Sequence, residues 1–260
     1  MLVCFDVDGV LVEVTQSYFR ALSETVSYFL QTAVDSDLLL ELKFRLNLNN
    51  DWDATLAGIL FYRSRFPFGE FIQKMSVGPP DYRKFYQRAE ALGLELPDYS
   101  LLIDKFEESY SRLRPLERLN ISRETLARIK SLPAKMAVVT GRTREDLDYT
   151  FRKFSLYEFF EVVISEDELP AVEMRKPSSY PLQLLFQTCR FSWPVCYIGD
   201  TLADRQMVEN FNQKIRKRIE FILYRHKFND GIPADYHVAN ERELLATIKK
   251  LRVKGNKINR

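Results

Sequence analysis

Glycine is scarce in this chain of 260 residues, which contains 9 glycines, about half of the usual share of roughly 7%. Cysteine is also rare. Cys4, Cys189 and Cys196 cannot all pair with one another, and no two of them have a C-x-x-C spacing. We therefore expect a reducing, cytoplasmic setting. We also expect the few glycines to stand where the backbone needs their conformational freedom.

Long apolar runs and a strong charge imbalance are also missing. No run approaches the roughly 20 apolar residues that a membrane-spanning helix needs, and an apolar start interrupted by Asp6 and Asp8 is a poor signal peptide. The 38 basic and 36 acidic residues give a formal charge of +2, so no global field attracts nucleic acid. We expect the basic runs 214–218 and 249–260 to be a solvated helix end and a frayed terminus. Neither a membrane nor a nucleic-acid partner is expected, and the oligomeric state is left open.

Short apolar stretches rich in Val, Ile and Phe alternate with helical patterns over much of the chain. The stretches are 2–5, 136–139, 160–164, 195–198 and 219–224. Near-continuous apolarity, rather than strict alternation, is typical of strands buried on both faces of a parallel sheet. The helical candidates between them are 122–132, 144–154, 179–189, 203–211 and 241–251. This order predicts a doubly wound α/β fold with a parallel sheet, in which ligands bind at the carboxyl ends of the strands.

The segment from residue 14 to residue 114 breaks this rhythm. It has no comparable strand run and is rich in aromatic residues. Helical patterns fill it instead, at 17–29, 37–44, 53–64, 68–75, 81–92 and 101–113. We therefore predict an all-α domain at 14–114, inserted into an α/β domain made of 1–13 and 115–260.

A pair of carboxylates follows the first predicted strand. Asp6 and Asp8 lie two residues apart, directly before Gly9, so both side chains can enter one loop pocket while the chain turns away. A calcium loop can also begin with D-x-D, but Ser17 stands at the twelfth position, where such a loop carries a Glu. The pattern indicates either a catalytic carboxylate pair or a turn rich in Asp and Gly.

Three further polar motifs lie at or near the ends of later strands. Thr140 and Gly141 end one strand, where backbone N–H groups can bind an anion or simply help to cap the next helix. Lys176 precedes a proline and a helix, and its ammonium suits a phosphate, although most surface lysines are only solvated. Asp200 and Asp204 follow another strand, and helix capping can explain Asp204 but not Asp200. Each motif alone has a structural explanation, but their common placement at strand ends favours one site.

In this order, D-x-D-G, a Thr at a strand end, a Lys and G-D-x-x-x-D resemble the signature of the haloacid dehalogenase superfamily. The resemblance covers the predicted α/β domain. The helical insert between the first two motifs is similar to the C1-type cap of subfamily IA, which includes the phosphoglycolate-phosphatase-like members. The resemblance implies a Rossmann-like core, an all-α C1 cap and a phosphoric monoester hydrolase that uses Mg²⁺.

The resemblance also implies a role for each motif residue. Asp6 is expected to be the nucleophile that forms an aspartyl-phosphate, and Asp8 the general acid and base. Mg²⁺ is expected to bind Asp6, the main-chain carbonyl of Asp8, and Asp200. Asp204 is expected to orient the site without touching the substrate. The residues expected to hold the phosphoryl oxygens are Gly9, Thr140, Gly141 and Lys176, and Lys176 is also expected to offset charge from Asp6.

The substrate implied by the resemblance is a small phosphorylated metabolite. Candidates for contacting it from the helical insert are Tyr18, Arg45, Asn50 and Trp52, whose alternative roles are core packing and helix capping. His226 and His237 stand apart from every motif, and we interpret both as structural or solvated.

Three other functions compete with hydrolysis of a phosphate ester. A phosphomutase or another phosphotransferase differs only in what accepts the phosphoryl group, and a binding or regulatory protein can keep the same fold without turnover. A carbon–halogen hydrolase is disfavoured, because such relatives need no metal and lack a second aspartate like Asp8.

Overall fold

The chain divides into two compact units, which are described separately. A computed structural model describes residues 1–76 and 82–258. One unit comprises Met1–Glu13 and Arg118–Arg260, and the other comprises Val14–Glu117. Among the described residues, no helix combines the length and the apolarity that crossing a membrane requires.

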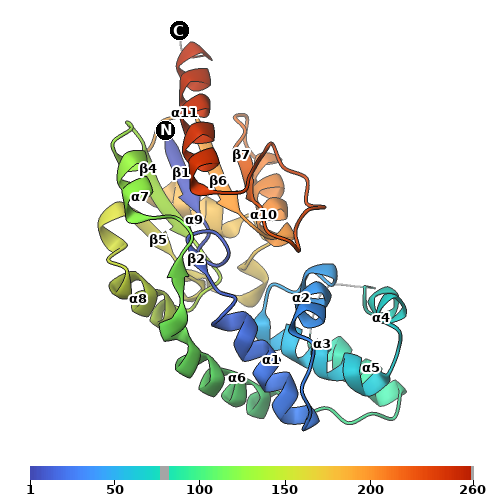
Figure 1. Ribbon diagram of the computed structural model, residues 1–260. Coiled ribbons are helices and arrows are strands. Elements are labelled where there is room, and N and C mark those ends of the chain that lie inside the picture. Colours follow the sequence, from blue (N-terminus) through green and yellow to red (C-terminus); the bar gives the residue numbers. More distant parts are fainter. Residues whose placement is uncertain (77–81, 259–260) are drawn as a thin grey trace. The chain divides into compact units, whose positions relative to one another are not determined.

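The first unit is built on a six-stranded parallel sheet with the strand order β5-β4-β1-β6-β7-β8 (Figure 1). The strands are β1 (Leu2–Phe5), β4 (Lys135–Val139), β5 (Val162–Ile164), β6 (Val195–Gly199), β7 (Glu220–Tyr224) and β8 (Tyr236–Val238). The central strands β1 and β6 are buried along their whole length, as strands covered on both faces should be. The predicted α/β class and its parallel sheet are confirmed.

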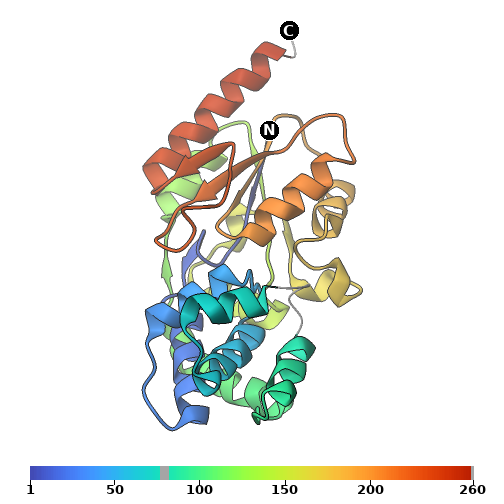
Figure 2. The same cartoon turned by 90° about the vertical axis from the view of Figure 1, so that its right-hand side faces the viewer.

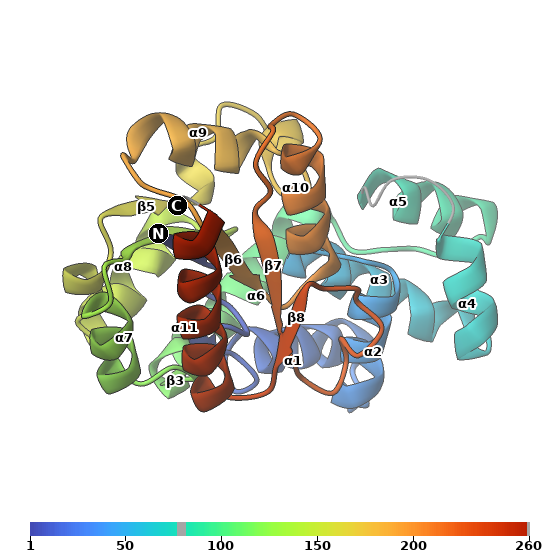
Figure 3. The same cartoon turned by 90° about the horizontal axis from the view of Figure 1, so that it is seen from above.

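Helices cover both faces of this sheet. They are α7 (Arg123–Lys130), α8 (Arg144–Lys153), α9 (Tyr180–Thr188), α10 (Leu202–Asn212) and α11 (Glu241–Ile258), with short 3-10 turns η2 (Tyr157–Phe159), η3 (Glu166–Glu168) and η4 (Val172–Met174). Figure 3 shows α9 and α10 on one face and α7, α8 and α11 on the other. The caps that start α7, α8 and α10 are the side chains of Ser122, Thr143 and Thr201, which accept N–H bonds from the first turn of each helix.

Some elements of this unit differ from the sequence-based expectation. Helix α11 runs to Ile258 instead of ending near residue 251, and its last turns extend past the sheet (Figure 2). Leu251 is the last buried residue of α11 among those whose burial is described, which end at Lys254. Strand β8 was not predicted, since Val238 is its only buried residue. A two-residue antiparallel pair, β2 (Val12–Glu13) with β3 (Arg118–Leu119), was also missed.

The first basic run is a solvated helix end, as expected, whereas the second continues α11 up to Ile258 instead of forming a frayed terminus. Residues 214 and 216–218 are exposed after the end of α10, and the second run lies on α11, as far as the described residues reach. Residues 259 and 260, the end of the second run, lie outside the described part of the chain.

In its described residues, the second unit consists of helices and the loops that connect them. Its helices are α1 (Tyr18–Leu30), α2 (Ser36–Arg45), α3 (Asp51–Ser64), α4 (Phe68–Met75), α5 (Tyr82–Ala91) and α6 (Tyr99–Leu113), followed by the 3-10 turn η1 (Arg114–Leu116). The predicted start of the fifth helix, Asp81, falls outside the described residues. Helix α6 shows why the spacing of apolar residues in the sequence predicted these helices. Leu102, Phe106, Tyr110 and Leu113 are all buried on one face, at spacings of three and four residues.

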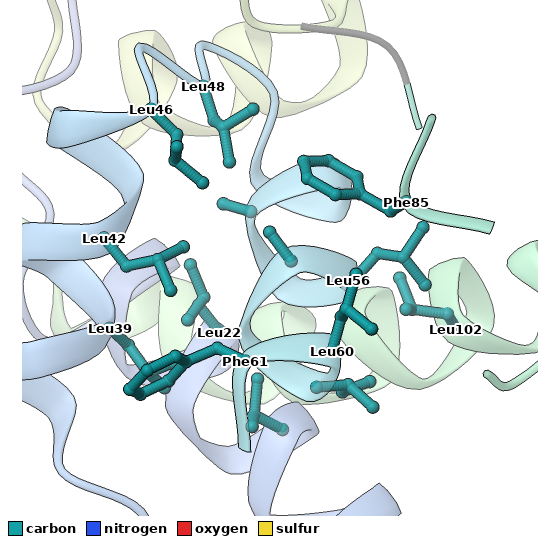
Figure 4. Packing of buried hydrophobic residues seen from close by; sticks show 14 of the residues in the cluster. Leu22, Leu39, Leu42, Leu46, Leu48, Leu56, Leu60, Phe61, Phe85 and Leu102 are labelled. Carbon is teal, nitrogen blue, oxygen red and sulfur yellow. The ribbon is translucent and has the colours of Figure 1, made fainter. Parts of the chain in front are cut away.

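Helix α3 forms the centre of this unit. It packs against α1, α2, α5 and α6, and every residue from Ala54 to Phe61 is buried. Figure 4 shows Leu56 and Leu60 of this helix among side chains from the surrounding helices. Helices α1 and α2 can approach α3 closely because residue 58 of α3 is a glycine. A Cβ atom at this position would lie 2.7 Å from Leu39 Cδ2 of α2.

The close contact at Gly58 gives a test of this packing. We expect Gly58→Val to lower the free energy of unfolding of the helical unit by about 1–3 kcal/mol, because the added methyl groups overfill a packed crossing. Gly69→Val is the matched control, since nothing lies within 4 Å of its Cβ position. Unfolding is followed by Trp52 fluorescence in a Trp193→Phe background. Equal effects of the two substitutions would contradict the packing argument.

Candidate active site

Asp6 and Asp200 are brought together by the two central strands. Each directly follows its strand, β1 for Asp6 and β6 for Asp200, and these strands pair in parallel register, with Phe5 opposite Ile198. The Asp6 N–H extends the ladder by donating to the Ile198 carbonyl at 2.9 Å. Both aspartates are buried. The predicted convergence of carboxylates at the carboxyl edge of the sheet is therefore present.

Lys176 lies between two buried carboxylates. Its Nζ is 2.9 Å from Asp6 Oδ1 and 2.7 Å from Asp204 Oδ1. The Val7 N–H donates to the same Asp6 oxygen at 2.8 Å. Because Lys176 comes from the loop before α9 and Asp204 from the first turn of α10, one ammonium joins three segments that are far apart in the chain.

Asp204 has hydrogen-bond donors on both of its oxygens. The Tyr197 hydroxyl donates to Oδ1 at 3.0 Å, and the Thr201 hydroxyl and N–H donate to Oδ2 at 2.7 and 3.2 Å. Together with Lys176, these donors give each Asp204 oxygen two partners. Asp204 is thus the third helical residue of the capping box that Thr201 starts at α10, and it also anchors Lys176.

The buried charges shift one another's pKa values in opposite directions. Burial raises the pKa of Asp6 well above its usual range, and the nearby carboxylates add to this while Lys176 opposes it. Burial by itself would lower the pKa of Lys176, but Asp204 and Asp6 outweigh it and raise that pKa. Burial would likewise raise the pKa of Asp204, yet Lys176 and the other donors lower it. Lys176 and Asp204 thus stay charged, whereas Lys176 offsets only part of the cost of burying a charge on Asp6.

Asp200 is the carboxylate with an unused oxygen. Its Oδ1 is buried and has no hydrogen-bond partner among the described residues. Burial raises the pKa of Asp200, and His226 offsets part of that rise. Oxygens of Asp6, Asp200 and Asp204 lie within 4.8 Å of one another. Since Asp204 is already saturated with donors, Asp6 and Asp200 are the pair that fits a hard divalent cation.

Two glycines allow the chain to pass close to these carboxylates. Gly9 has a φ of +71°, and a Cβ atom there would lie 2.1 Å from Asp200 Oδ2. At Gly199, a Cβ atom would lie 2.5 Å from that of Asp204. Neither position can hold a side chain without moving a carboxylate. The expectation that scarce glycines mark positions with a conformational need is met here.

The loop after β4 holds Thr140 and Arg142. Thr140 is buried, and its N–H donates to the Ile164 carbonyl at 3.0 Å while its hydroxyl accepts from the Arg142 N–H at 3.2 Å. Arg142 donates to Asp8 Oδ1 from Nε at 2.9 Å and from Nη2 at 2.6 Å. The neighbouring Gly141 is exposed. The sequence analysis assigned no role to Arg142. The available signal was its place directly after a strand-end glycine.

His226 and Asn229 support Asp200 from the loop after β7. His226 Nε2 lies 3.3 Å from Asp200 Oδ2, and its Nδ1 accepts from the Phe228 N–H at 3.2 Å. The buried Asn229 amide donates to the main-chain carbonyl of Asp200 at 2.8 Å. The interpretation of His226 as isolated was therefore wrong, because β7 lies next to β6 and brings their following loops together. His237 is exposed on β8, as expected.

The four candidates for substrate contact all lie in the helical unit, and three have structural contacts there. The Tyr18 ring stacks on Tyr110 at a centroid distance of 4.0 Å. The Asn50 side chain caps α3, and Trp52 Nε1 donates to a glutamate, Glu107, at 2.9 Å. Arg45 differs, because its side chain is 65% exposed and lies 3.5 Å from Glu41 on the same helix.

Comparison with known proteins identifies several relatives of this chain. Residues 1–212 match the sequence model of the haloacid dehalogenase-like hydrolases. An imidazoleglycerol-phosphate dehydratase from Phytophthora nicotianae is 28% identical over 204 residues, which are 76% of this chain. This chain spans only 39% of the length of that relative.

Two solved structures share the fold over most of the chain. Phosphatase Tt82 from Thermococcus thioreducens has a TM-score of 0.68 and 24% identity, covering 96% of this chain and 99% of its own. A predicted phosphoglycolate phosphatase from Haemophilus somnus has a TM-score of 0.64 and 16% identity, covering 95% and 96%.

The buried position of Lys176 predicts a large and pH-dependent stability effect. We expect Lys176→Met to lower the free energy of unfolding by about 3–5 kcal/mol, because two buried carboxylates lose their counterion. The loss should be larger at pH 8 than at pH 6. Without Lys176 the folded-state carboxyl pKa values rise, so stability falls as the pH increases through them. Denaturant unfolding in the presence of a chelator measures both effects.

Lys135→Met is the matched control for this measurement. Lys135 lies 2.6 Å from Glu161, but both side chains are close to half exposed, and solvent-accessible ion pairs contribute little. We expect no pH-dependent change for this variant. A Lys176→Met protein as stable as the Lys135→Met protein would show that the buried ion pairs do not hold the site together.

Proposed function

Because the chain belongs to the haloacid dehalogenase-like hydrolase family, we propose that it is a Mg²⁺-dependent phosphatase acting on a small phosphate monoester. The observation that carries the proposal is the pairing of Asp6, anchored by Lys176, with Asp200, whose buried Oδ1 has no donor among the described residues. A nucleophilic carboxylate beside an unsatisfied carboxylate suits phosphoryl transfer, which depends mainly on positioning and charge neutralisation.

The residues that would hold Mg²⁺ are Asp6, the main-chain carbonyl of Asp8, and Asp200. When bound, the ion supplies positive charge to a buried site in which carboxylates outnumber ammonium groups, so that a phosphate dianion can enter. Lys176 and Thr140, with the backbone at Gly9 and Gly141, are the proposed contacts for the phosphoryl oxygens. Asp204 keeps Lys176 in place without touching the substrate.

The reaction would proceed in two displacements. In the first, an Asp6 carboxylate oxygen bonds to phosphorus while the bond to the ester oxygen breaks, and Asp8 gives its proton to that leaving oxygen. In the second, Asp8 takes a proton from water as the water oxygen bonds to phosphorus. The bond to Asp6 then breaks, and inorganic phosphate and the free carboxylate are released. Each residue ends in its starting state.

We also propose that the helical domain predicted at 14–114 is a C1-type cap that selects the leaving group. Its side chains Tyr18, Arg45, Asn50 and Trp52 are the proposed contacts. The free thiols of Cys4, Cys189 and Cys196, all buried, support a reducing, cytoplasmic setting for the reaction.

Asp6 and the metal can be tested with 4-nitrophenyl phosphate. We expect hydrolysis to require Mg²⁺ and to fall by at least about 100-fold in Asp6→Asn, because the amide is not a nucleophile. Asp8→Asn should also be severely impaired. Asp104→Asn, an exposed aspartate on α6, is the control and should keep full activity. Wild-type activity that survives chelation would overturn the metal requirement, and an active Asp6→Asn protein would overturn the mechanism.

Arg45 offers the cleanest test of the cap's role, because a surface ion pair with Glu41 is the one polar contact of its side chain within the described part of the chain. Across a panel of phosphorylated metabolites, we expect Arg45→Ala to raise KM for the preferred, acidic substrates by about tenfold, which corresponds to one lost charged contact. Its thermal stability should not change. Lys74→Ala is the matched control, since Lys74 forms the same kind of helical pair with Glu70 at 3.5 Å. An unchanged substrate ranking in Arg45→Ala would remove Arg45 from the proposed contacts.

A further inference from the structure

Arg142 is a buried cation whose charged end is directed at one oxygen of Asp8. The side chain of Arg142 is 0% exposed, whereas that of Asp8 is 35% exposed. Nε and Nη2 both donate to Asp8 Oδ1, at 2.9 and 2.6 Å. A guanidinium that is bonded through two of its nitrogens is fixed in direction as well as in distance. One Asp8 oxygen, Oδ1, is therefore held in a fixed direction by Arg142.

Arg142, which donates these two bonds, is itself held in place by other hydrogen bonds. The third guanidinium nitrogen, Nη1, donates to the Thr150 hydroxyl on α8 at 2.5 Å. The Arg142 main chain is tied at both ends, because its N–H donates to the Thr140 hydroxyl and its carbonyl accepts from the Glu166 N–H at 2.9 Å. Thr150 on α8 thus holds the guanidinium, and Thr140 in the loop after β4 and Glu166 after β5 hold the main chain that carries it.

We propose that Arg142 is a positioning residue for the general acid, holding Asp8 Oδ1 so that Oδ2 serves the leaving-group oxygen. This inference rests on the proposed phosphatase function. In the first displacement, Oδ2 gives its proton to the ester oxygen as the bond from phosphorus to that oxygen breaks and the bond to Asp6 forms. Oδ1 accepts the Arg142 hydrogen bonds before and after the transfer, because a carboxyl and a carboxylate both keep an acceptor there. Proton transfer then needs no reorientation of Asp8.

The leaving group provides a readout that a merely structural role of Arg142 would not change. Phenyl phosphate releases a poor leaving group that needs a proton, whereas 2,4-dinitrophenyl phosphate releases a stable anion that does not. We expect Arg142→Met to lower kcat/KM for phenyl phosphate by at least about 30-fold, a part of the 10²–10⁴-fold that a positioned acid contributes. The loss for 2,4-dinitrophenyl phosphate should stay below about threefold. The quantity compared is kcat/KM, because it reports the first displacement.

Two further variants keep the proposal testable if Arg142→Met does not fold. Arg142→Lys retains the charge but cannot form the fork, so we expect an intermediate, leaving-group-dependent loss. Thr150→Val removes the acceptor of Nη1 and should act in the same direction with a smaller effect. Arg144→Met is the matched control, because this arginine, the first residue of α8, pairs with Glu168 instead of Asp8. Its ratio of the two kcat/KM values should equal that of the wild type.

The outcomes separate the inference from the function on which it rests. Equal losses on both substrates, or no loss on either, would overturn the positioning role while the phosphatase proposal stands. Absence of Mg²⁺-dependent hydrolysis of 2,4-dinitrophenyl phosphate by the wild-type protein would overturn the proposed function, and the role of Arg142 with it. A loss confined to phenyl phosphate in the Arg142 variants supports the proposal.

Discussion

The ammonium of Lys176, buried between the carboxylates of Asp6 and Asp204, is the interaction on which the site depends. One positive charge compensates two negative ones, and Asp200 adds a third carboxylate within the same few ångströms. Burying this much negative charge would be costly without the lysine. Under the proposed function, this excess of negative charge means that a phosphate dianion would need a cation beside it.

The carboxylates of the site differ in what surrounds them rather than in chemistry. Asp204 is saturated by Lys176 and by hydroxyl donors, so it acts as a structural anion. Asp200 keeps a buried oxygen with no donor among the described residues. The Asp8 side chain is about one-third exposed and is held on one oxygen. Environments that separate identical groups in this way let one amino-acid type perform several tasks.

Much of the fold and of the site could be predicted from the sequence, because both follow from strand order. The apolar runs predicted a parallel sheet. Because Asp6 and Asp200 each follow a strand, their convergence at one edge of the sheet could also be predicted, and the same motifs made the family recognisable. Contacts set by loop geometry could not be predicted. His226 is 26 residues beyond Asp200 and touches it only because β7 lies next to β6. Arg142 reaches Asp8 through a long flexible side chain, whose direction no local pattern specifies. The end of α11 was missed because the helix continues to Ile258, beyond residue 251, where the regular apolar spacing of the sequence ends.

The central place of β1 in the sheet has a consequence for synthesis of the chain. This strand leaves the ribosome before either of its neighbours, β4 and β6, which follow more than a hundred residues later. Its fully apolar sequence must therefore wait unpaired while the helical segment emerges and gains its own core from local contacts. The pairing of β1 is complete only after β6 has been made, so Asp6 and Asp200 can come together only at that stage.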